Sequence, residues 1–525
     1  MTLSLKSSSQ HSLRCKALLA AVAPLAVAGD GCGDALVRHI TIDSREVQPG
    51  SLFVAIRGYA TDGHRFIGSA VERGAVAVIC EELPPDIASS CLYLKVADAR
   101  KALADTAKLF YRNVSDQLML IGVTGTNGKT TTAKLITAML NANGISAGYI
   151  GTNLCQIGEQ HIQLERTTPE AHELHLLFSA MAEAGCKAVV MEVSSHALVL
   201  QRVYGLRFQS VIFTNLTLDH LDFHLSMEEY AAAKQLLFDQ LAPEGFAVFN
   251  SDDPAAVQMA ERVAPEKIYC CTLQRDYHSI HHSIPQCSHH VEADILASSI
   301  SSSSVDLHFP KQIVPMQVGL PGRFNVMNVL EAATVGFGLG LAPEKISQSL
   351  AAISAVDGRM ERVGDGSHGY SVFVDYAHTP DALYKALDTL RRLKPSTSRL
   401  VVVFGCGGNR DHAKRPEMGR IAAELADEVL VTSDNPRDEN PETILDDIVS
   451  GITGTNYTRI SNRAEAICHA VTLLQAGDVL LVAGKGHERY QEIAGKKYHF
   501  SDQEILRNSM QHKSAGISAK EHNCQ

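Results

Sequence analysis

The chain has 525 residues, of which 45% are hydrophobic and 20% are charged, and its formal net charge at pH 7 is -11. This length exceeds one hydrophobic core of ordinary size and predicts about three domains. The composition is typical of a globular protein, and the acidic balance argues against general affinity for nucleic acid, which needs clustered Lys and Arg. An anionic ligand must therefore be bound by local sites.

The N-terminal region has features of a secretory signal. Arg14 and Lys16 precede an apolar run over residues 17–29. Pro24 interrupts this run and Asp30 follows it, so we expect instead a short amphipathic helix packed on the first domain. No run reaches the roughly 18 uninterrupted apolar residues that span a bilayer. The 12 cysteines lack zinc-ribbon spacing, which favours free thiols in a reducing compartment over a disulfide framework. We therefore expect a cytoplasmic protein that does not insert into membranes.

The first part of the chain predicts a small α/β domain. Short β-branched runs occur in residues 39–58, 74–82 and 91–98, between Gly and Pro turns and helical stretches. A helical segment over 98–112 then leads to the strand that ends at Gly125. These features place the first domain boundary near residue 100.

The middle and last parts alternate apolar runs with helical segments. Residues 187–195, 209–217 and 245–253 are apolar strands with polar ends, as expected of a parallel sheet with crossover helices. From about Val356 a third α/β pattern begins, with helices that end at Leu393 and Leu425. We predict an α/β protein of three domains, with a central P-loop ATPase parallel sheet and a C-terminal Rossmann-like domain.

Residues 277–304 are rich in His and Ser, with His278, His281, His282, His289 and His290 among them. A metal site is conceivable, but these histidines lack an i, i+4 pattern and no nearby Asp or Cys completes a ligand set. We expect a solvated loop or an edge hairpin.

The strongest single motif is a phosphate-binding loop within residues 120–135. An apolar strand leads into Gly125 and Gly128, followed by Lys129, Thr130 and a helix. Glycines let backbone N–H groups approach phosphate oxygens, and the helix N-terminus adds positive potential. Lys129 is expected to meet the β and γ phosphates, and the Thr130 hydroxyl to ligate Mg²⁺. Val123 occupies the position six residues before the lysine, where the general motif has glycine.

Two further strands end in polar residues and are expected to reach the same sheet edge. One ends with Glu192 and the other is followed by Asp219 and His220. Glu192 and His220 are suitable ligands for a second metal ion, although capping and turn formation explain each motif singly. Lys234 lies soon after, on an alanine-rich helix. Periodicity alone would place it on a solvated face, but its position near this cluster keeps a functional role open.

Taken together, these motifs resemble those of the Mur ligases, which form amide bonds with ATP in peptidoglycan precursor synthesis. The matching stretches follow the family's order over nearly the whole chain: DSR (43–45), GTNGKTTT (125–132), EVSSHAL (192–198), TNLTLDHLDFH (214–224), YAAAK (230–234), LPGRFNVMN (320–328), DGRMERV (357–363), VDYAHTPDAL (374–383), GCGGNRDHAKRPEMG (405–419) and GKGHERYQ (484–491).

The resemblance implies a domain order and a reaction. Residues 1–100 would bind a UDP-sugar, 101–353 would form the ATPase domain, and 354–525 would bring an amino acid. Within the family the chain is most similar to enzymes that add the third stem-peptide residue to UDP-N-acetylmuramoyl-L-alanyl-D-glutamate. ATP phosphorylates the free γ-carboxylate, the amine attacks the acyl phosphate, and phosphate leaves. Because two anions must meet, positive charge must be concentrated there, which Lys129 and two Mg²⁺ would supply.

The resemblance also assigns residue roles. The catalytic group is Lys129, Lys234 and His220. The metal ligands are Thr130, Glu192, His220 and Lys234, the last as the carbamate found in this family. The ATP contacts are Gly125, Thr126, Asn127, Gly128, Lys129, Thr130, Thr131, Asn328, Arg359 and Asp375. The UDP-sugar dipeptide contacts are Ile42, Ser44, Tyr59, Ala60, Thr61, Thr167, Thr168, Ser194 and Arg202. Arg166 and Leu200 stand where other members have Asn and Gln.

The third residue is meso-diaminopimelate in one branch of the family and L-lysine in another. Diaminopimelate carries an extra distal carboxylate, which a planar guanidinium can bind with two hydrogen bonds. The stretch DNPR (434–437) provides Arg437 for that carboxylate, with carboxylate and amide groups beside it. The expected diaminopimelate contacts are Arg410, Asp434, Asn435, Pro436, Arg437, Gly484 and Glu488. The alternative is a helix N-cap loop, which we expect to be correct for Asp438 and Glu439.

The motifs argue against three other functions. Lysine addition or a folylpolyglutamate-type ligase would keep the family, but the DSR and DNPR motifs disfavour both. A phosphate-loop switch protein would not explain the motifs in the C-terminal part. A catalytically dead binding protein is disfavoured by the intact Lys129, Glu192 and Lys234. We expect a monomer whose domains close on small-molecule substrates: ATP, the UDP-sugar dipeptide and meso-diaminopimelate.

Overall fold

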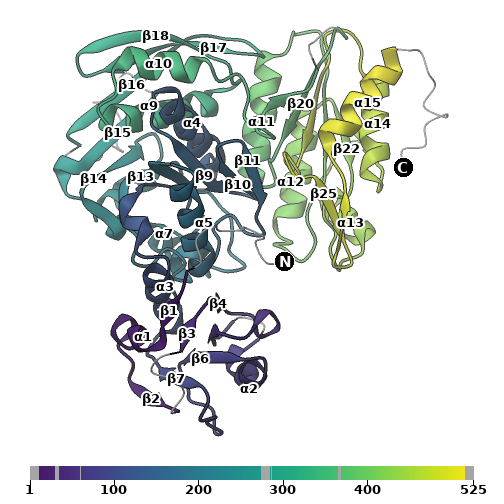
Figure 1. Cartoon of the computed structure of the whole chain (residues 1–525). Helices are drawn as coiled ribbons and strands as arrows, with labels where there is room; N and C mark the ends of the chain where they lie inside the picture. Colours follow the sequence, from purple (N-terminus) through teal and green to yellow (C-terminus); the bar gives the residue numbers. More distant parts are fainter. Residues whose placement is uncertain are drawn as a thin grey trace.

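The computed structural model describes residues 11–29, 35–58, 61–273, 284, 287–364 and 368–514. Three α/β units follow one another along the chain, each with its own sheet. In Figure 1 the N-terminal unit, in purple, lies below the central unit, and the C-terminal unit, in green to yellow, lies beside it. The predicted α/β class and three-domain architecture are confirmed. Within the described ranges, no helix has both the length and the apolar character needed to cross a membrane.

The N-terminal sheet has five strands. Their order is β2 (Ala26–Ala28), β7 (Leu92–Lys95), β6 (Ala75–Cys80), β5 (Ser51–Val54) and β4 (His39–Thr41). All pairings are parallel except that of β2 with β7. Helix α1 (Cys15–Val22) buries Cys15 and Leu18 in this unit's core. The expected short helix is therefore present, but the apolar run that contains it continues into strand β2.

The central sheet has eleven strands, and its inner strands are parallel. Their order is β11 (Gln160–Gln163), β10 (Leu154–Ile157), β9 (Ala147–Gly151), β12 (Ala188–Glu192), β8 (Met119–Thr124), β13 (Phe208–Phe213), β14 (Leu241–Asn250), β15 (Ile268–Thr272), β16 (His289–Ser298), β17 (Ser303–Phe309) and β18 (Gln312–Val318). Strands β9 to β16 of this order pair in parallel, and the strands outside them are antiparallel.

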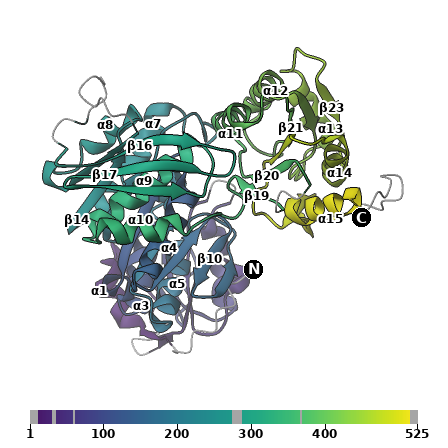
Figure 2. The same ribbon diagram turned by 90° about the horizontal axis from the view of Figure 1, so that it is seen from above.

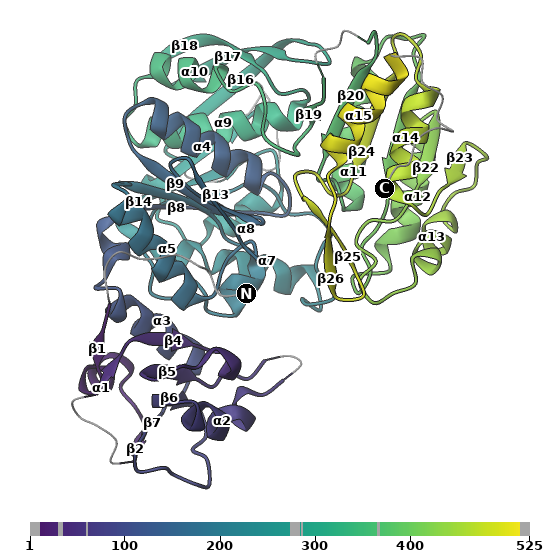
Figure 3. The same ribbon diagram turned by 45° about the vertical axis from the view of Figure 1, so that its right-hand side comes forward.

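Helices cover both faces of the central sheet, because its inner strands are apolar on both sides. One face packs against α4 (Lys129–Ala142), α9 (Arg323–Gly338) and α10 (Pro343–Ala351). The other packs against α5 (Ala171–Glu183), α7 (Met227–Gln235) and α8 (Ala255–Ala260). Figure 3 shows α4 and α9 above the sheet and α5 and α7 below it. The site-bearing loops therefore rest on a sandwich with two hydrophobic layers.

The described part of the His/Ser-rich segment forms a hairpin inside the sheet. Strands β16 and β17 pair antiparallel, and Ser299–Ser302 make the turn between them. The hairpin prediction is confirmed for this part, but its placement at the edge is wrong, because β18 pairs outside β17. Residues 277–283, 285 and 286 lie outside the described ranges. A disulfide joins Cys270 and Cys287, so the expectation of free thiols is wrong for this pair. Among the other described cysteines, Cys80, Cys155, Cys186, Cys271 and Cys406 are free thiols.

The C-terminal sheet has six strands, in the order β19 (Glu361–Arg362), β20 (Ser371–Asp375), β24 (Val479–Ala483), β21 (Leu400–Phe404), β22 (Glu428–Val431) and β23 (Tyr457–Arg459). Helices α11 (Pro380–Leu393), α12 (Lys414–Leu425) and α13 (Pro441–Val449) cover one face. Helices α14 (Arg463–Leu473) and α15 (Asp502–Ser514) cover the other. Figure 2 shows this unit set apart from the central one, with α11 and β19 nearest the junction.

Candidate active site

The phosphate loop lies at the carboxyl end of β8, in the middle of the central sheet. Gly125 has φ +146°, and a Cβ atom there would collide with the Thr214 hydroxyl, so only glycine fits. Gly128 has φ +87° and directly precedes α4. The Lys129 ammonium donates to the carbonyl oxygens of Gly125 and Thr126 at 3.0 and 2.7 Å. The loop is therefore preformed around the lysine, with the helix N-terminus directed at the same space.

Glu192, at the end of β12, lies beside the phosphate loop. The Thr130 hydroxyl donates to its carboxylate at 2.8 Å, and the Tyr149 hydroxyl does so at 2.6 Å. The backbone N–H of Thr152 donates to it at 3.0 Å. Burial opposes ionisation, but Lys129 and these donors outweigh it and lower the pKa of Glu192. The site thus holds a buried carboxylate in its ionised form.

Lys234 reaches the same loop from α7, so the helix does not present it to solvent. Its side chain is 1% exposed, and its ammonium donates to the carbonyl oxygen of Gly125 at 2.8 Å. Burial, and then the charge of Lys129, lower its pKa well below the ordinary value. An amine of lowered pKa is uncharged at a lower pH and can then act as a nucleophile.

Histidines gather next to Lys234. The His196 and His220 rings lie 4.8 Å apart, and the Tyr230 ring lies 6.1 Å from that of His220. Burial lowers the pKa of His220 to about 3 and that of His196 to about 4. Both imidazoles are therefore neutral at pH 7, which is the form that ligates metal.

The predicted nucleotide contacts come from both sides of the junction between the central and C-terminal units. On the central side, the Thr132 hydroxyl donates to Asn328 at 3.3 Å beneath the loop. From the C-terminal side, Arg359 donates to the Thr130 hydroxyl at 2.8 Å. Asp375 accepts from the N–H groups of Met360 and Ala377, at 2.6 and 2.8 Å, and so holds the segment that carries Arg359.

Asp381 on α11 also belongs to this junction, and the sequence analysis missed it. The Asn127 side chain donates to its carboxylate at 2.7 Å. Asp381 stands inside the quoted VDYAHTPDAL motif, which is the signal that could have found it, but its partner lies 254 positions away in the sequence.

The predicted UDP-sugar dipeptide contacts fall into two groups. Ile42, Ser44 and Thr61 lie in the N-terminal unit, and Tyr59 and Ala60 lie outside the described residues. The second group surrounds Glu192. The Thr168 hydroxyl donates to the carbonyl oxygen of Glu192 at 2.9 Å and accepts from the N–H of Ser194 at 3.1 Å. The Thr152 and Thr167 hydroxyls lie 3.3 Å apart.

Arg202 lies beside this second group. Its guanidinium donates to the carbonyl oxygen of Thr168 at 3.1 Å and pairs with the Glu170 carboxylate at 2.8 Å. Arg166 reaches the same carboxylate at 4.0 Å. Two guanidiniums are therefore held next to the threonines by one acidic residue.

The DNPR stretch (434–437) follows β22 and forms a buried polar cluster with Lys485 and Glu488, called the DNPR cluster below. The Asn435 side chain donates to Glu488 at 2.9 Å, and Lys485 donates to Asn435 at 3.0 Å. Gly484 has φ +116°, and a Cβ atom there would lie 2.7 Å from an Asp434 carboxylate oxygen. Burial opposes ionisation of Asp434, but Lys485 and Arg463 outweigh it and lower its pKa. The structure thus gathers residues 434, 435, 484 and 488, which the sequence analysis grouped.

Arg437 is the last residue of the DNPR stretch and lies beside this cluster. It has φ +51° and donates to the carbonyl oxygen of Gly408 at 2.7 Å. A Cβ atom on Gly407 would lie 3.0 Å from the Arg437 guanidinium and 3.8 Å from Cγ of Arg410, so both arginines border this glycine. Arg410 is exposed to solvent. The Arg437 guanidinium and the stem of the exposed Arg410 side chain therefore both lie beside Gly407.

A hairpin of β25 (Tyr490–Ile493) and β26 (Lys496–His499) covers this stretch. The N–H of Arg437 donates to the carbonyl oxygen of Glu492 at 3.0 Å, and the Glu492 carboxylate lies 3.4 Å from the Arg437 guanidinium. Lys485 and Glu492 are polar residues of this site that the sequence analysis missed. Lys485 stands inside the quoted GKGHERYQ motif, which is the signal that could have found it.

Asp438 and Glu439 were expected to serve the positive end of the next helix. Asn440 is the N-cap of α13, and its side chain accepts from the N–H of Glu442 at 3.0 Å. Glu439 instead pairs with the buried Arg415 at 2.9 Å. Glu439 therefore neutralises a fully buried guanidinium, and the effect of Asp438 and Glu439 on the N-terminus of α13 stays a prediction.

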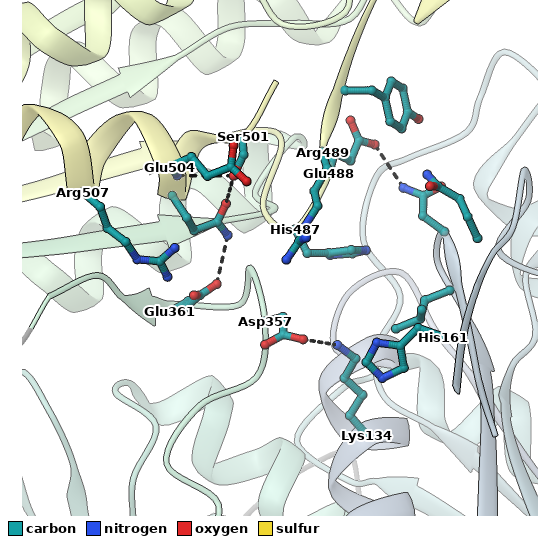
Figure 4. A pocket seen from close by; sticks show the side chains of 15 residues that line it. Lys134, His161, Asp357, Glu361, His487, Glu488, Arg489, Ser501, Glu504 and Arg507 are labelled. Carbon is teal, nitrogen blue, oxygen red and sulfur yellow. Dashed lines mark hydrogen bonds and ion pairs between the residues drawn. The ribbon is translucent and has the colours of Figure 1, made fainter. Parts of the chain in front are cut away.

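Two consecutive residues after β9 connect the phosphate loop with the DNPR cluster. Thr152 donates to Glu192, and its carbonyl oxygen contacts the His487 ring nitrogen at 3.0 Å. Asn153 donates to Glu488 at 3.3 Å. Beside them lies an open cavity of about 430 Å³, lined by Lys134, His161, Asp357, Arg489 and Arg507 among others. Figure 4 shows Lys134 and His161 from the central unit facing Asp357 and His487 across it.

The donor set beside Glu192 fits a hard divalent cation. Thr130 and Glu192 offer oxygen atoms, which Mg²⁺ prefers, and the carboxylate is ionised although it is 0% exposed. Lys234 contacts the same phosphate loop at the carbonyl oxygen of Gly125, and the His220 ring lies next to that of Tyr230, on the helix that carries Lys234. The residues present therefore suit Mg²⁺, with the phosphate loop as the neighbouring anion site.

Comparisons with known proteins agree with this architecture. Mur ligase models match three stretches: the family's catalytic domain over residues 36–111, the middle domain over 123–336 and the glutamate ligase domain over 358–486. The chain is 60% identical to the UDP-N-acetylmuramoyl-L-alanyl-D-glutamate--2,6-diaminopimelate ligase of Chlorobaculum tepidum, over 93% of this chain and 96% of that protein. It is 58% identical to the protein of that name in Chlorobium phaeobacteroides, over 96% and 98%.

Solved structures are similar as well. One of a UDP-N-acetylmuramoyl-L-alanyl-D-glutamate--2,6-diaminopimelate ligase is 32% identical with a TM-score of 0.62, over 91% of this chain and 95% of that one. MurF from Acinetobacter baumannii has a TM-score of 0.65 at 17% identity, over 96% and 100%, and this likeness concerns the fold alone. The matched models, the full-length relatives and the three-unit fold lead to one conclusion: the chain belongs to the Mur ligase family.

Proposed function

We propose that the protein is an ATP-dependent ligase that adds meso-2,6-diaminopimelate to UDP-N-acetylmuramoyl-L-alanyl-D-glutamate, in peptidoglycan precursor synthesis. The new amide joins the amine to the γ-carboxylate of D-glutamate, with release of ADP and phosphate. The observation that carries this proposal is the nearly full-length similarity to diaminopimelate ligases at about 60% identity. The arrangement of charged groups at the two ends of the junction supports it.

The chemistry of the reaction requires positive charge at the phosphate loop, where Lys129 and Arg359 lie near the buried carboxylate of Glu192. The γ-carboxylate oxygen attacks the terminal phosphorus of ATP, ADP leaves, and an acyl phosphate forms. The free amine then attacks the acyl carbon and loses a proton, and the tetrahedral intermediate expels phosphate. In the first step two anions approach each other, so preorganised positive charge lowers the barrier.

Lys129 is suited to this task because the loop holds it close to where phosphates bind. Arg359 would bring a second positive charge from the C-terminal unit, since it already contacts Thr130 at 2.8 Å. Thr130, Glu192, His220 and Lys234 would hold Mg²⁺, which supplies charge neutralisation and orients phosphate oxygens when bound. Gly125 through Thr131, with Asn328 and Asp375, would bind the nucleotide.

Lys234 would serve as a carbamate. A protonated amine would repel a divalent cation, whereas a carbamate presents two anionic oxygens to it. Burial supports this modification, because an uncharged amine is the form that adds carbon dioxide, and burial lowers the pKa of Lys234. The addition forms one N–C bond and releases one proton.

The DNPR cluster and Arg437 would determine which amino acid is added. Arg437, with Arg410 beside Gly407, would bind the distal carboxylate of diaminopimelate, and Asp434, Asn435 and Glu488 its ammonium and polar groups. L-Lysine lacks that carboxylate and would leave Arg437 without an anionic ligand. The residues around Thr168 and Arg202, together with Ile42, Ser44, Tyr59, Ala60 and Thr61, would bind the UDP-sugar dipeptide.

The test is a phosphate-release assay on the purified protein with ATP, Mg²⁺ and the UDP-muramoyl dipeptide. We expect release only when meso-diaminopimelate is present, with turnover by L-lysine lower by about 30-fold or more, as expected for a lost charge partner of roughly 2–5 kcal/mol. Equal turnover with L-lysine would overturn the substrate assignment. Release without any amine acceptor would overturn the ligase assignment itself.

A further inference from the structure

Two cysteines and one histidine lie close together at strands β15 and β16 of the central sheet. Strand β15 pairs in parallel with β16, and in that register Cys270 lies opposite His290. Residues directly opposite on neighbouring strands project from the same face. Cys287, just before β16, reaches the same point, and its Cα lies 6.4 Å from that of Cys270. Three side chains of the metal-ligating types are thus gathered by the sheet.

The distances match a single ligand set. The two sulfur atoms and an imidazole nitrogen of His290 all lie within 4.8 Å of one another. Cys270 is buried, whereas Cys287 and His290 are half-buried, so the cluster has one side open to solvent. The sequence analysis judged that no cysteine completes a set with these histidines. The pairing of β15 with β16 brings Cys270 next to His290, and Cys287 lies just before β16.

The site is separate from the proposed catalytic centre. Cys270 packs in the core layer beneath α8, whereas the next residue, Cys271, packs in the opposite layer beneath α9. Helix α9 carries Asn328 and Glu331, beside the phosphate loop. The sheet therefore separates this cluster from α4 and α9. Lys234 on α7 lies on the same face as Cys270, but it contacts the loop after β8, three strands away from β15.

We propose that, once its disulfide is reduced, the cluster of Cys270, Cys287 and His290 binds one soft divalent cation of the Zn²⁺ class. Two thiolates and one imidazole are a typical ligand set for Zn²⁺, and the solvent side leaves the fourth position to water. The chemistry starts from the joined cysteines. A dithiol or phosphine reductant supplies two electrons and is itself oxidised, and the two sulfurs take up two protons. The cation then displaces both thiol protons into solvent.

The experiment is a titration of the full-length protein with Co²⁺, followed by Zn²⁺. The protein is first reduced with a phosphine, and the excess reductant is removed. We expect thiolate-to-cobalt charge-transfer absorption that saturates near one Co²⁺ per chain and disappears when Zn²⁺ is added. Cobalt at an oxygen-rich magnesium site lacks this absorption, so the signal reports on sulfur ligands alone. Protein kept in the disulfide form is expected to show no such band.

Three variants make the assignment specific. Cys287→Ser and His290→Gln change half-buried residues and are expected to weaken cobalt binding at least 10-fold, while phosphate release in the ligase assay stays within twofold of the wild type. Cys468→Ser, a half-buried cysteine elsewhere, is the matched control and is expected to retain the full band. The proposal is overturned if the reduced wild type shows no charge-transfer band, or if Cys287→Ser keeps it.

Discussion

The guanidinium of Arg437 lies 3.4 Å from the carboxylate of Glu492. Glu492 is part of strand β25, in the hairpin that covers the DNPR stretch. Both side chains are partly exposed, at 22% and 26%, so the pair itself contributes only about 0–1 kcal/mol. The arginine is therefore held in position without being strongly bound. A substrate carboxylate can replace or join Glu492 at little cost.

Arg437→Ala is expected to raise the KM for diaminopimelate by about 10-fold or more, because a lost buried charge partner costs roughly 2–5 kcal/mol. The KM for ATP is expected to change less than twofold. Initial rates of phosphate release at varied diaminopimelate concentration measure both. Glu492→Gln, which removes only the weak pair, is expected to change the KM less than about fivefold. An unchanged KM in Arg437→Ala would show that this arginine does not bind the substrate.

Lys234→Met is expected to raise the stability of the folded protein and to lower its ligase activity. Between the lowered pKa of Lys234 and its ordinary value of 10.5, the unfolded chain binds one more proton than the folded chain. Stability therefore rises with pH through that window, and at pH 7 the buried amine costs stability. Methionine removes this cost, so Tm should rise by about 2 °C or more in metal-free buffer without carbon dioxide.

The same variant should lose ligase activity about 100-fold or more, since removal of a metal ligand costs several kcal/mol. Scanning calorimetry and the phosphate assay measure the two effects. Lys345→Met, at an exposed position of α10, is the control and should change neither. A Tm below that of the wild type, or full activity, would contradict the expected role of Lys234.

Glu331→Gln should change how stability depends on pH. Burial raises the pKa of Glu331 to about 8, from an ordinary value of 4.5. Between these values the folded chain keeps a proton that the unfolded chain releases, so stability is lost as pH rises from 4.5 to about 8. The slope is about 1.4 kcal/mol per pH unit. Glutamine still accepts from Thr132, whose hydroxyl lies 2.7 Å from the carboxylate, but does not titrate.

Urea unfolding at pH 5, 6.5 and 8 measures this effect. The wild type is expected to lose stability relative to Glu331→Gln as pH rises, with the largest difference at pH 8. Glu266→Gln, at an exposed position, should follow the wild type. Parallel pH curves for Glu331→Gln and the wild type would show that Glu331 titrates normally.

Asp502→Ala should destabilise the C-terminal unit by about 3–5 kcal/mol, because it leaves a buried cation without its partner. Arg463 and Asp502 are both 0% exposed and are joined by two hydrogen bonds, at 2.8 and 2.7 Å. Arg463 also donates to the carbonyl oxygen of Ala483, directly before Gly484. Chemical denaturation of the intact chain measures the loss. Asp446→Ala, on the exposed Arg459 pair, should cost less than about 1 kcal/mol.

Local patterns carried most of the prediction of the fold. The strand, glycine loop and helix around Lys129 form within about 20 residues, so periodicity and turn chemistry suffice to predict them. Helices α11 and α12 end at Leu393 and Leu425, as their apolar periodicity indicated. The grouping of site residues at strand ends likewise follows from parallel-sheet geometry.

Long-range pairing accounts for what was missed. Asp381 reaches Asn127 across the junction of two units, and Lys485 reaches Asn435 across 50 residues. Quoted motifs contain both Asp381 and Lys485, but the local sequence does not reveal which distant residue each one contacts. The Cys270–Cys287 pair depends on the register of β15 and β16, which spacing alone does not reveal.

Thr152 and Asn153 are neighbours in the chain, yet one holds Glu192 and the other holds Glu488. A shift of this dipeptide by a fraction of an ångström would loosen one hydrogen bond while it tightens the other. One dipeptide therefore bridges the carboxylate beside the phosphate loop and the carboxylate beside the DNPR stretch, so both ends of the candidate site depend on the same short segment after β9.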